Sequence, residues 1–551
     1  MPAMPSKPPF IHRPLLQVLP VDSAAVATVR AAAARALTAL RGAPARVCFL
    51  ALVLGGLSAM TMPARAAAAS TEPAAAALSA KPCRLKGVEF EALCGTVKRA
   101  LDPAQPKGTQ IDVHYAVLPA LARRKAADPV FFFAGGPGQS AIDLAGPLSR
   151  RYARLGQRRD LVFVDQRGTG RSAPLKCADD DERSALRPLA EGADPAARLL
   201  ALKACGVALR KLPHGDLRQY TTSIAVADVD AVRAALGAPR INAIGASYGT
   251  RAVLEYQRQF APHLRRAVID GVAPPDMVLP ASFSTDNQAA LDAVFSTCEG
   301  EAACHTRYPQ LRQHWHQLLA RLPLQAMVAH PMTGQEERLT ITSEQLLGAV
   351  RGPLYAPTLA AALPAALHQA SQLRFGAVLG LSAALGLSGG SMATGMHFSV
   401  ICAEDMPRLD RANDAPGADF GRGFADIYRQ VCVDWPRGQP PPEFYRITPA
   451  QTAVLVLSGG ADPATPPRHG ERAANALGAK ARHVVAAAAG HGVLGLACVR
   501  DAAMRFIDAA SDDAALKVET GCAAAIPRPL VFVPLQVDAQ AKAQASAVGK
   551  P

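Results

Sequence analysis

Short apolar runs recur along this chain of 551 residues, and loops rich in glycine follow several of them. These runs predict buried strands at residues 129–133, 161–164, 240–244, 453–457 and 482–486. The eleven residues at 250–260 contain neither proline nor glycine, which predicts a helix. Alternating strands and helices are typical of an α/β fold with a mostly parallel central sheet flanked by helices.

The middle of the chain has a different, mostly helical pattern, as at residues 311–322 and 359–373. We therefore expect a mainly helical cap inserted into the core, with a flexible loop at Leu387–Gly395. The expected organisation is a leader at 1–66, a flexible linker at 67–82, a core in two parts at 83–280 and 450–530, the cap at 281–449, and a flexible tail at 531–551.

The sequence GASYG at Gly245–Gly249 lies between a predicted strand and a predicted helix. In a G-x-S-x-G elbow the serine occupies a strained turn, so only small residues fit two positions on either side. The serine also lies at a helix N-terminus, where developing negative charge is favoured. This context predicts that Ser247 is a nucleophile.

A serine nucleophile needs a base, and the base needs a partner that fixes its tautomer. Asp462 follows the strand at 453–457, and His491 follows the last predicted strand in a glycine-flanked loop. We therefore assign Asp462 as the acid and His491 as the base. Asp270, which also follows a predicted strand, is the alternative acid, and His469 and His483 read as surface or packing histidines.

An oxyanion hole needs two backbone N–H donors. One is expected from Tyr248, the residue after the nucleophile, and the other from the glycine-rich loop after residues 129–133. Gly136 is the preferred second donor and Gly135 is the alternative.

Four motifs in this order carry a resemblance to a known family: GGPG at 135–138, DQRGTGRS at 165–172, GASYGT at 245–250, and GGADPATP at 459–466 with GHG at 490–492. The chain resembles the prolyl/tripeptidyl aminopeptidase family of secreted α/β-hydrolases, which are serine peptidases with a TAP-like C-terminal region. The resemblance runs from about Cys83 to about Cys522. One departure is Ala134, which stands where the family usually has histidine.

The resemblance implies an α/β-hydrolase fold whose cap lies between nucleophile and acid. It implies a serine aminopeptidase that acts on peptides with a free N-terminus through an acyl-enzyme, without metal or organic cofactor. It also implies that Thr465 orients Asp462 by a hydroxyl hydrogen bond, and that Asp165 and Arg167 tie their loop to the oxyanion loop. A carboxylesterase of the same fold and a non-catalytic binding protein are the alternative functions.

An aminopeptidase must hold a free ammonium group, which requires an anionic or carbonyl-rich pocket. Glu404 follows an apolar run and a cysteine expected to form a disulfide, so it is the candidate for substrate binding. The alternative is a solvated surface acid. The preferred cleavage site, the number of residues released and the oligomeric state are left open by the sequence.

The net charge of +14 is reduced to +8 beyond the first 66 residues, which hold seven Lys or Arg and one Asp. This charge forms no basic block and is not interleaved with aromatic residues, so nucleic acid is not an expected partner. Half of the residues are hydrophobic, which is enough for a sizeable core.

Targeting signals precede the expected fold. Arg41 and Arg46 come before the apolar run at 47–60, and Ala64–Ala66 offers an A-x-A cleavage site. We expect an exported protein, periplasmic or secreted, without a stable membrane span after cleavage; a retained anchor is the alternative. Ten cysteines remain after the leader, which favours disulfides over a zinc site. The expected pairs are 83–94, 177–205, 298–304, 402–432 and 498–522.

Overall fold

A computed structural model describes residues 80–180, 186–386 and 392–534. The chain from Ala74 onwards forms one compact unit. The expected leader, most of the linker, residues 387–391 of the expected loop and most of the C-terminal tail lie outside the described residues. The last two residues of that expected loop are helical instead of flexible. The division into a core and a cap at residues 281–449 stays a prediction, because both belong to the same compact unit.

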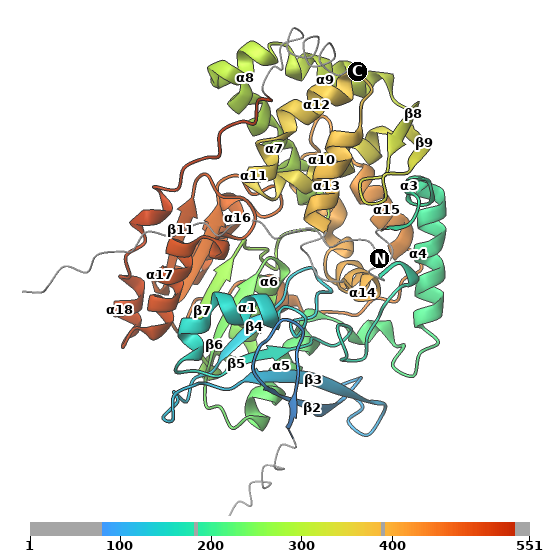
Figure 1. Cartoon of the computed structure of the whole chain (residues 1–551). Helices are drawn as coiled ribbons and strands as arrows, with labels where there is room; N and C mark the ends of the chain where they lie inside the picture. Colours follow the sequence, from blue (N-terminus) through green and yellow to red (C-terminus); the bar gives the residue numbers. More distant parts are fainter. Residues whose placement is uncertain (1–79, 181–185, 387–391, 535–551) are drawn as a thin grey trace, which may run out of the picture. The chain divides into compact units, whose positions relative to one another are not determined.

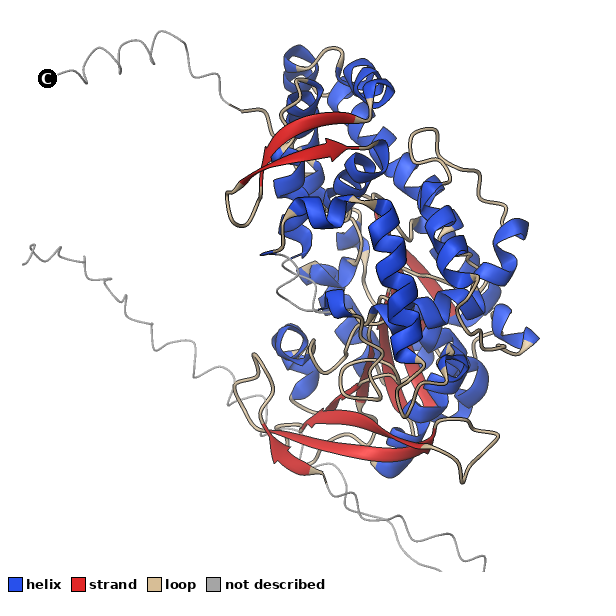
Figure 2. Ribbon diagram, turned by 90° about the vertical axis from the view of Figure 1, so that its right-hand side faces the viewer, coloured by secondary structure: helices blue, strands red, loops and turns tan. Residues whose placement is uncertain are grey.

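A nine-stranded sheet forms the centre of the described structure (Figures 1 and 2). Its order is β1-β2-β3-β5-β4-β6-β7-β10-β11, with antiparallel pairing from β1 to β5 and parallel pairing from β5 to β11. The strands are β1 Lys81–Cys83, β2 Ala92–Ala100, β3 Gln110–Leu118, β4 Val130–Phe133, β5 Leu161–Val164, β6 Ile241–Ala246, β7 Leu264–Asp270, β10 Val454–Gly459 and β11 Ala481–Ala486. The mostly parallel sheet expected from the sequence is confirmed, and all five predicted strands belong to it.

The central strands are buried on both faces, which explains why they read as continuous apolar runs. Successive side chains of β4 alternate between two hydrophobic clusters: Phe131 and Phe133 pack on one face of the sheet, and Phe132 on the other. Helices α5 and α6 supply apolar side chains to the first cluster, and α1 and α17 to the second. The helices of this part are α1 Ala145–Arg151, α2 Ala153–Gly156, α3 Leu189–Ala193, α4 Pro195–Leu209, α5 Thr222–Ala235, α6 Tyr248–Phe260, α16 Pro467–Leu477, α17 Ala497–Asp508 and α18 Asp512–Leu516.

The chain between β7 and β10 is mostly helical, as expected, and has a third hydrophobic cluster of its own. In Figure 1 most of its helices gather on one side of the sheet. A two-stranded hairpin lies within it, which the sequence reading missed. The elements are α7 Ala281–Gly300, α8 Ala302–Arg307, α9 Leu311–Arg321, β8 Leu324–Ala329, β9 Glu336–Ile341, α10 Ser343–Leu354, α11 Pro357–Ala360, α12 Leu363–Ser371, α13 Gly376–Gly386, α14 Thr394–Glu404 and α15 Gly423–Cys432.

Helix α10 begins with a capping box, in which Thr342 and Gln345 satisfy each other's backbone N–H groups. This start fixes the register of the helix whose other end reaches the site described below.

All five expected disulfides form: 83–94, 177–205, 298–304, 402–432 and 498–522. The pair Cys402–Cys432 joins α14 to α15, and the pair Cys298–Cys304 joins α7 to α8. Crosslinks of this number are typical of proteins that fold in an oxidising compartment.

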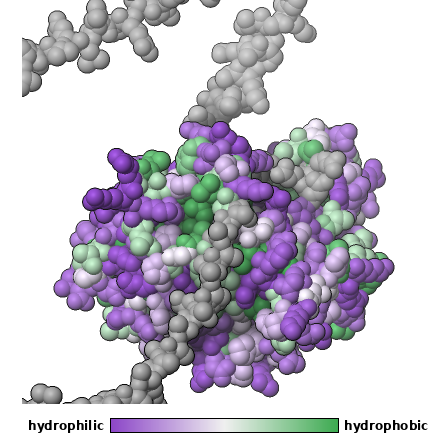
Figure 3. All heavy atoms as spheres, turned by 90° about the horizontal axis from the view of Figure 1, so that it is seen from below, coloured by the Kyte–Doolittle hydropathy of each residue, from purple (hydrophilic) through white to green (hydrophobic). Residues whose placement is uncertain are grey.

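Polar side chains predominate on the face of the molecule in Figure 3, where apolar side chains occupy a smaller area near the middle. None of the helices at the described positions is long and apolar enough to cross a membrane.

Candidate active site

Ser247 lies between β6 and α6 in the strained conformation expected of an elbow, with φ 56° and ψ −126°. Its backbone N–H donates to the carbonyl of Asp270 at 2.9 Å, which ties the turn to the end of β7. A Cβ on Gly249 would lie 2.1 Å from the carbonyl oxygen of Phe133, and one on Gly245 would lie 2.6 Å from that of Gly249. Only glycine therefore fits these two positions.

The imidazole of His491 is bonded to Asp462. Its Nδ1 donates to Asp462 Oδ2 at 2.8 Å, since an ionised carboxylate can only accept. The other carboxylate oxygen accepts from the backbone N–H groups of Ala464 and Thr465, and the Thr465 hydroxyl donates to Oδ2 at 2.8 Å. The hydroxyl hydrogen bond implied for Thr465 is therefore present.

Asp462 and His491 each shift the pKa of the other in favour of its charged form. Burial lowers the pKa of His491, but the charge of Asp462 and its hydrogen bond outweigh burial and leave that pKa above its usual value. Burial raises the pKa of Asp462, yet His491 and the backbone donors hold it below its usual value. At neutral pH Asp462 is thus ionised, and the hydrogen bond keeps the proton of neutral His491 on Nδ1. The Nε2 lone pair is then available to a proton donor.

Gly271 lies close to both the nucleophile elbow and the pair of His491 and Asp462. It follows Asp270, whose carbonyl accepts from Ser247, and it has a positive φ of 64°. A Cβ at Gly271 would lie 3.3 Å from His491 Cε1 and 3.5 Å from Asp462 Oδ2. The three predicted residues therefore gather at the carboxyl ends of neighbouring strands. Among the described residues the Ser247 hydroxyl has no hydrogen-bond partner, and this includes His491.

The alternative acid, Asp270, has a different role. Its carboxylate accepts from the backbone N–H groups of Val493 at 2.9 Å and Leu494 at 2.8 Å, which anchors the short turn η8 (Val493–Gly495) after His491. Burial raises the pKa of Asp270 to about 6. Asp270 supports the histidine loop, and Asp462 is the residue bonded to the imidazole.

The two other histidines considered from the sequence lie elsewhere. His469 is buried and bonded to Asp286 at 2.9 Å, which joins α16 to α7. His483 lies on β11 and contacts the Ser458 hydroxyl at 3.0 Å. Both are packing residues: His469 is buried, and His483 is partly buried.

The glycine-rich loop after β4 reaches the nucleophile. A Cβ on Gly135 would lie 3.3 Å from Ser247 Cβ, and Gly136 has a positive φ of 107°. The N–H of Tyr248 lies at the first position of α6, where a backbone donor has no partner within the helix. The choice of Gly136 over Gly135 as second donor stays a prediction.

Asp165 and Arg167, which are both buried, have different roles near this loop. Asp165 accepts from the Ser140 hydroxyl at 2.6 Å and from the backbone of Ile142, so it ties its own loop to the oxyanion loop as expected. Arg167 has a different contact, because its guanidinium pairs with Asp228 of α5 at 2.6 Å. Arg167 therefore braces the sheet against a helix.

Helix α14 holds the same loop from the other side. Ala393, just before α14, donates from its backbone to the carbonyl of Gly138 at 2.9 Å. His397 Nδ1 donates to the carbonyl of Pro137 at 3.3 Å, and its Nε2 accepts from the Tyr428 hydroxyl at 2.8 Å. Burial lowers the pKa of His397 to about 4, so this histidine is neutral at physiological pH.

The expected role of Glu404 is corrected by the structure. Its side chain is fully buried, and its carboxylate accepts from the backbone N–H of Thr222 at 2.6 Å and from the Thr222 hydroxyl at 3.0 Å. Arg251 lies 3.4 Å from the same carboxylate and 2.9 Å from that of Asp405. A group enclosed in this way cannot receive the ammonium of a substrate.

Glu404 instead ends a hydrogen-bonded chain behind the elbow. Gln166 donates to the hydroxyl of Tyr248 at 2.9 Å, that hydroxyl donates to Thr222 at 2.7 Å, and Thr222 donates to Glu404. The chain fixes the side chain of the residue whose N–H is the expected oxyanion donor. Sequence reading gave no signal for this network, because its members are distant in the chain.

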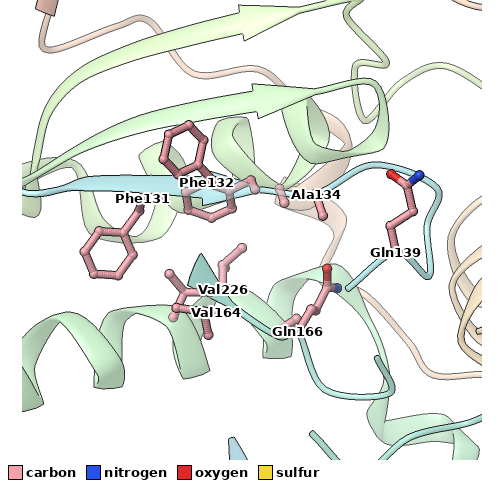
Figure 4. Close-up of a pocket in the computed structure, with 11 residues that line it drawn as sticks. Phe131, Phe132, Ala134, Gln139, Val164, Gln166 and Val226 are labelled. Atoms are coloured by element: carbon pink, nitrogen blue, oxygen red, sulfur yellow. The ribbon is translucent and has the colours of Figure 1, made fainter. Parts of the chain in front are cut away.

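A small cavity lies beside the oxyanion loop, and Figure 4 shows the side chains that line it. Apolar side chains such as Phe131 and Val226 line one end. The amides of Gln139 and Gln166 lie at the other end, and Gln139 Oε1 would lie 3.2 Å from a Cβ on Gly135. The polar end of this cavity is therefore next to the nucleophile.

Within the described ranges, no group of three or more His, Cys, Asp or Glu side chains could hold a metal ion. Neither a metal nor a cofactor was expected from the sequence.

Comparisons with known proteins place this chain among hydrolases. Residues 418–519 match the family model described as TAP-like protein. The serine protease Hip1 of Mycobacterium tuberculosis is 25% identical over 434 residues, which cover 72% of this chain and 82% of that protein. The tripeptidyl aminopeptidase of Streptomyces lividans is 31% identical over 195 residues, 33% of this chain and 35% of that protein.

A third relative has a name from another class of hydrolase. Carboxylesterase B of M. tuberculosis is 28% identical over 428 residues, which cover 70% of this chain and 78% of that protein. Among solved structures, a proline iminopeptidase-related protein from Thermus thermophilus is 17% identical with a TM-score of 0.37, covering 76% of this chain and 99% of that one. A TM-score of this size carries no argument about function.

Proposed function

Because this chain belongs to the α/β-hydrolases with a TAP-like C-terminal region and is a serine hydrolase, we propose that it is an exported aminopeptidase that releases N-terminal residues or short peptides from peptides. The observation that carries the proposal is the hydrogen bond of 2.8 Å between His491 and Asp462 beside the Ser247 elbow. No metal or organic cofactor takes part in the proposed reaction.

In the proposed mechanism, His491 Nε2 takes the proton of the Ser247 hydroxyl as its oxygen attacks the substrate carbonyl. Asp462 keeps the imidazole in the tautomer that leaves Nε2 unprotonated, and it stabilises the imidazolium that forms. The N–H groups of Tyr248 and Gly136 stabilise the tetrahedral oxyanion. His491 then protonates the leaving amine, and water hydrolyses the acyl-enzyme by the same route in reverse.

Release of short peptides is favoured over release of single residues. In a single-residue aminopeptidase, the substrate ammonium is attached to the carbon next to the scissile carbonyl, so a carboxylate or a group of carbonyl oxygens must lie close to the nucleophile. The three carboxylates considered for the site have other partners: Asp462 is bonded to His491, Asp270 to backbone donors, and Glu404 to Thr222 and Arg251. A longer N-terminal segment would carry its ammonium away from the catalytic residues.

Export is part of the proposal. Five disulfides support folding in an oxidising compartment. The leader at residues 1–66 and its cleavage site at Ala64–Ala66 lie outside the described residues, so they rest on the sequence. Expression of the full chain in a bacterium, followed by fractionation and N-terminal sequencing of the mature protein, tests this part.

The activity test uses two substrates with the same leaving group, a tripeptidyl nitroanilide with a free N-terminus and its acetylated form. We expect the free form to be hydrolysed and the acetylated form to be a poor substrate. The variant S247A should lose turnover by several orders of magnitude. Equal hydrolysis of both forms would argue against an aminopeptidase.

A carboxylesterase is the second candidate, supported by the similarity to carboxylesterase B. A short-chain nitrophenyl ester assayed beside the tripeptidyl nitroanilide separates the two candidates. An esterase would turn over the ester and leave the anilide intact.

A further inference from the structure

Arg351 on α10 is a cation close to the proposed base, and its guanidinium is largely unused. One hydrogen bond is formed, from Nη2 to the hydroxyl of Tyr355 at 2.9 Å. Its Nε is buried and has no partner, and no carboxylate of the described residues forms an ion pair with it. An arginine offers five N–H donors in a fork that matches a carboxylate, so most of this capacity is open.

Aromatic rings hold this guanidinium in place. Its central carbon lies 4.8 Å from the ring centre of Phe283, 5.6 Å from that of Phe424 and 5.7 Å from that of Tyr355. Cation–π contacts of this kind offset part of the cost of removing a cation from water, but they satisfy none of its N–H groups. Arg351 as a whole is half-buried, although its Nε is buried.

Two other arginines that lie over aromatic rings have more partners than Arg351. Arg312 lies 4.7 Å from the ring centre of Phe295 and pairs with Asp292 and Glu299. Arg408 lies over Tyr445 and donates to two backbone carbonyls. Arg351 differs from them in having an open fork next to the site of chemistry.

Two contacts place Arg351 near the reacting atoms. The ring of Tyr355 packs edge-on against the imidazole of His491, with the ring centres 5.1 Å apart. Since the guanidinium lies over the same tyrosine, its carbon is no more than about 11 Å from the imidazole centre. An extended peptide rises about 3.3 Å per residue, so a substrate group within about three residues of the scissile bond reaches this cation.

The electrostatic effect of Arg351 agrees with this position. Its charge opposes the rise in the pKa of His491 that Asp462 causes, and it adds to the effect of burial in lowering the pKa of His397, the histidine bonded to the oxyanion loop. The charge of Arg351 therefore acts both on the proposed base and on the histidine that holds the oxyanion loop. A substrate ammonium would be repelled here, whereas an anionic group would be attracted.

We propose that Arg351 binds a carboxylate of the substrate, so that the enzyme selects short peptides that present a carboxylate within about three residues of the cleaved bond. The proposal rests on the proposed peptidase function. The carboxylate has two possible sources, the C-terminus of a short peptide or the side chain of an aspartate or glutamate. A charge-assisted, two-pronged contact of this kind changes kcat/KM by about 10- to 100-fold.

The test compares matched substrates. Alanine oligopeptides of four to six residues with a free N-terminus are assayed as C-terminal acids and as C-terminal amides. A second set of amides carries glutamate or glutamine at each successive position. The ratio of kcat/KM between the members of each pair is measured for the unaltered protein, R351Q, R351K and R307Q. Arg307 also lies over a tyrosine, but its side chain is exposed on α8, so R307Q is the matched control.

In the unaltered protein and in R307Q, we expect one of two preferences in kcat/KM to exceed about 10-fold. These are the preference for the C-terminal acid over the amide and the preference for glutamate over glutamine. The same ratio should fall toward 1 in R351Q and stay intermediate in R351K, which keeps the charge without the fork. A preference for acids identifies the C-terminal carboxylate, and a preference for glutamate identifies a side chain. Ratios near 1 for the unaltered protein, or an unchanged ratio in both Arg351 variants, would overturn the proposal.

A failure of this proposal is distinguishable from a failure of the proposed function. A tripeptidyl nitroanilide has no carboxylate, so its hydrolysis depends on the peptidase site and not on carboxylate binding. Hydrolysis of the anilide with ratios near 1 would reject only the role of Arg351. If the unaltered protein does not hydrolyse the anilide, the peptidase function itself is rejected.

Discussion

The backbone N–H of His491 donates a hydrogen bond of 2.9 Å to the carbonyl oxygen of Tyr355, at the end of α10. A residue from the helical insertion thus fixes the loop that carries the proposed base. The position of the imidazole therefore depends on the insertion. A rearrangement of α10 would move His491 as well as the side chains of the insertion that surround it.

The close approach at Gly490 offers a test of this coupling. A Cβ there would lie 2.3 Å from the carbonyl oxygen of Tyr355, so G490A must displace either the histidine loop or the end of α10. We expect kcat to fall by about 100-fold or more, because small displacements of catalytic groups are costly. G495A is the matched control, since a Cβ at Gly495 has no atom within 4 Å. Similar turnover in the two variants would contradict the coupling.

Asp462 and Asp270 should respond differently to the same substitution. D462N removes the group that fixes the tautomer of His491, and we expect kcat to fall by about 10⁴-fold, as in a related triad. D270N disturbs two backbone hydrogen bonds of the η8 turn, and we expect mainly a loss of about 1–3 kcal/mol in the free energy of unfolding. Steady-state kinetics and urea denaturation of both variants measure the two effects. A larger kinetic loss in D270N would reverse the assignment.

The pH dependence of activity should report on His491. The imidazole acts as a base only when neutral, and Asp462 raises its pKa above the usual 6.5. We therefore expect kcat/KM to rise with pH and to reach half of its maximum above pH 6.5. Because burial also raises the pKa of Glu404 to about 7, the profile of E404Q serves as the control. An inflection that disappears in E404Q would show that the profile reports Glu404 and not the base.

Substitution of Glu404 distinguishes a structural role from substrate binding. Glu404 acts on the site indirectly, through Thr222 and Tyr248 and through Arg251 of α6, so E404Q should reduce turnover of a peptide anilide and a simple ester by the same factor. A selective rise in KM for peptides with a free N-terminus would restore the role in substrate binding that the sequence suggested.

Glu404 should also make stability depend on pH. Its pKa is about 7 in the folded protein against an ordinary 4.5, so the folded state binds the proton more tightly. The stabilising contribution is therefore present below pH 4.5 and is lost as the pH rises through 7, to a total of about 3 kcal/mol. Urea denaturation at pH 5 and pH 8 should show a larger loss for the unaltered protein than for E404Q. Equal losses would contradict the raised pKa.

Local pattern was sufficient for the parts of the site that depend on neighbouring residues. The elbow at Ser247 requires glycine on both sides because backbone atoms occupy the space of any side chain. The strands before Asp462 and His491 were visible as apolar runs because both faces of a central strand are buried. The cysteine spacing also predicted the five pairs, since each closes a loop of moderate length.

The amino-acid sequence by itself determined the fold class and the order of nucleophile, acid and base, because these depend on periodicity and on turns of a few residues. Only the tertiary structure decided which carboxylate is bonded to His491 and that Glu404 is enclosed. It also decided that Arg351 lies near the imidazole with most of its N–H donors unpaired. Burial and ion pairing depend on side chains that can lie far apart in the chain, as Glu404 and Thr222 do at a separation of 182 residues. Their distances arise only when α10 and α14 pack against the sheet.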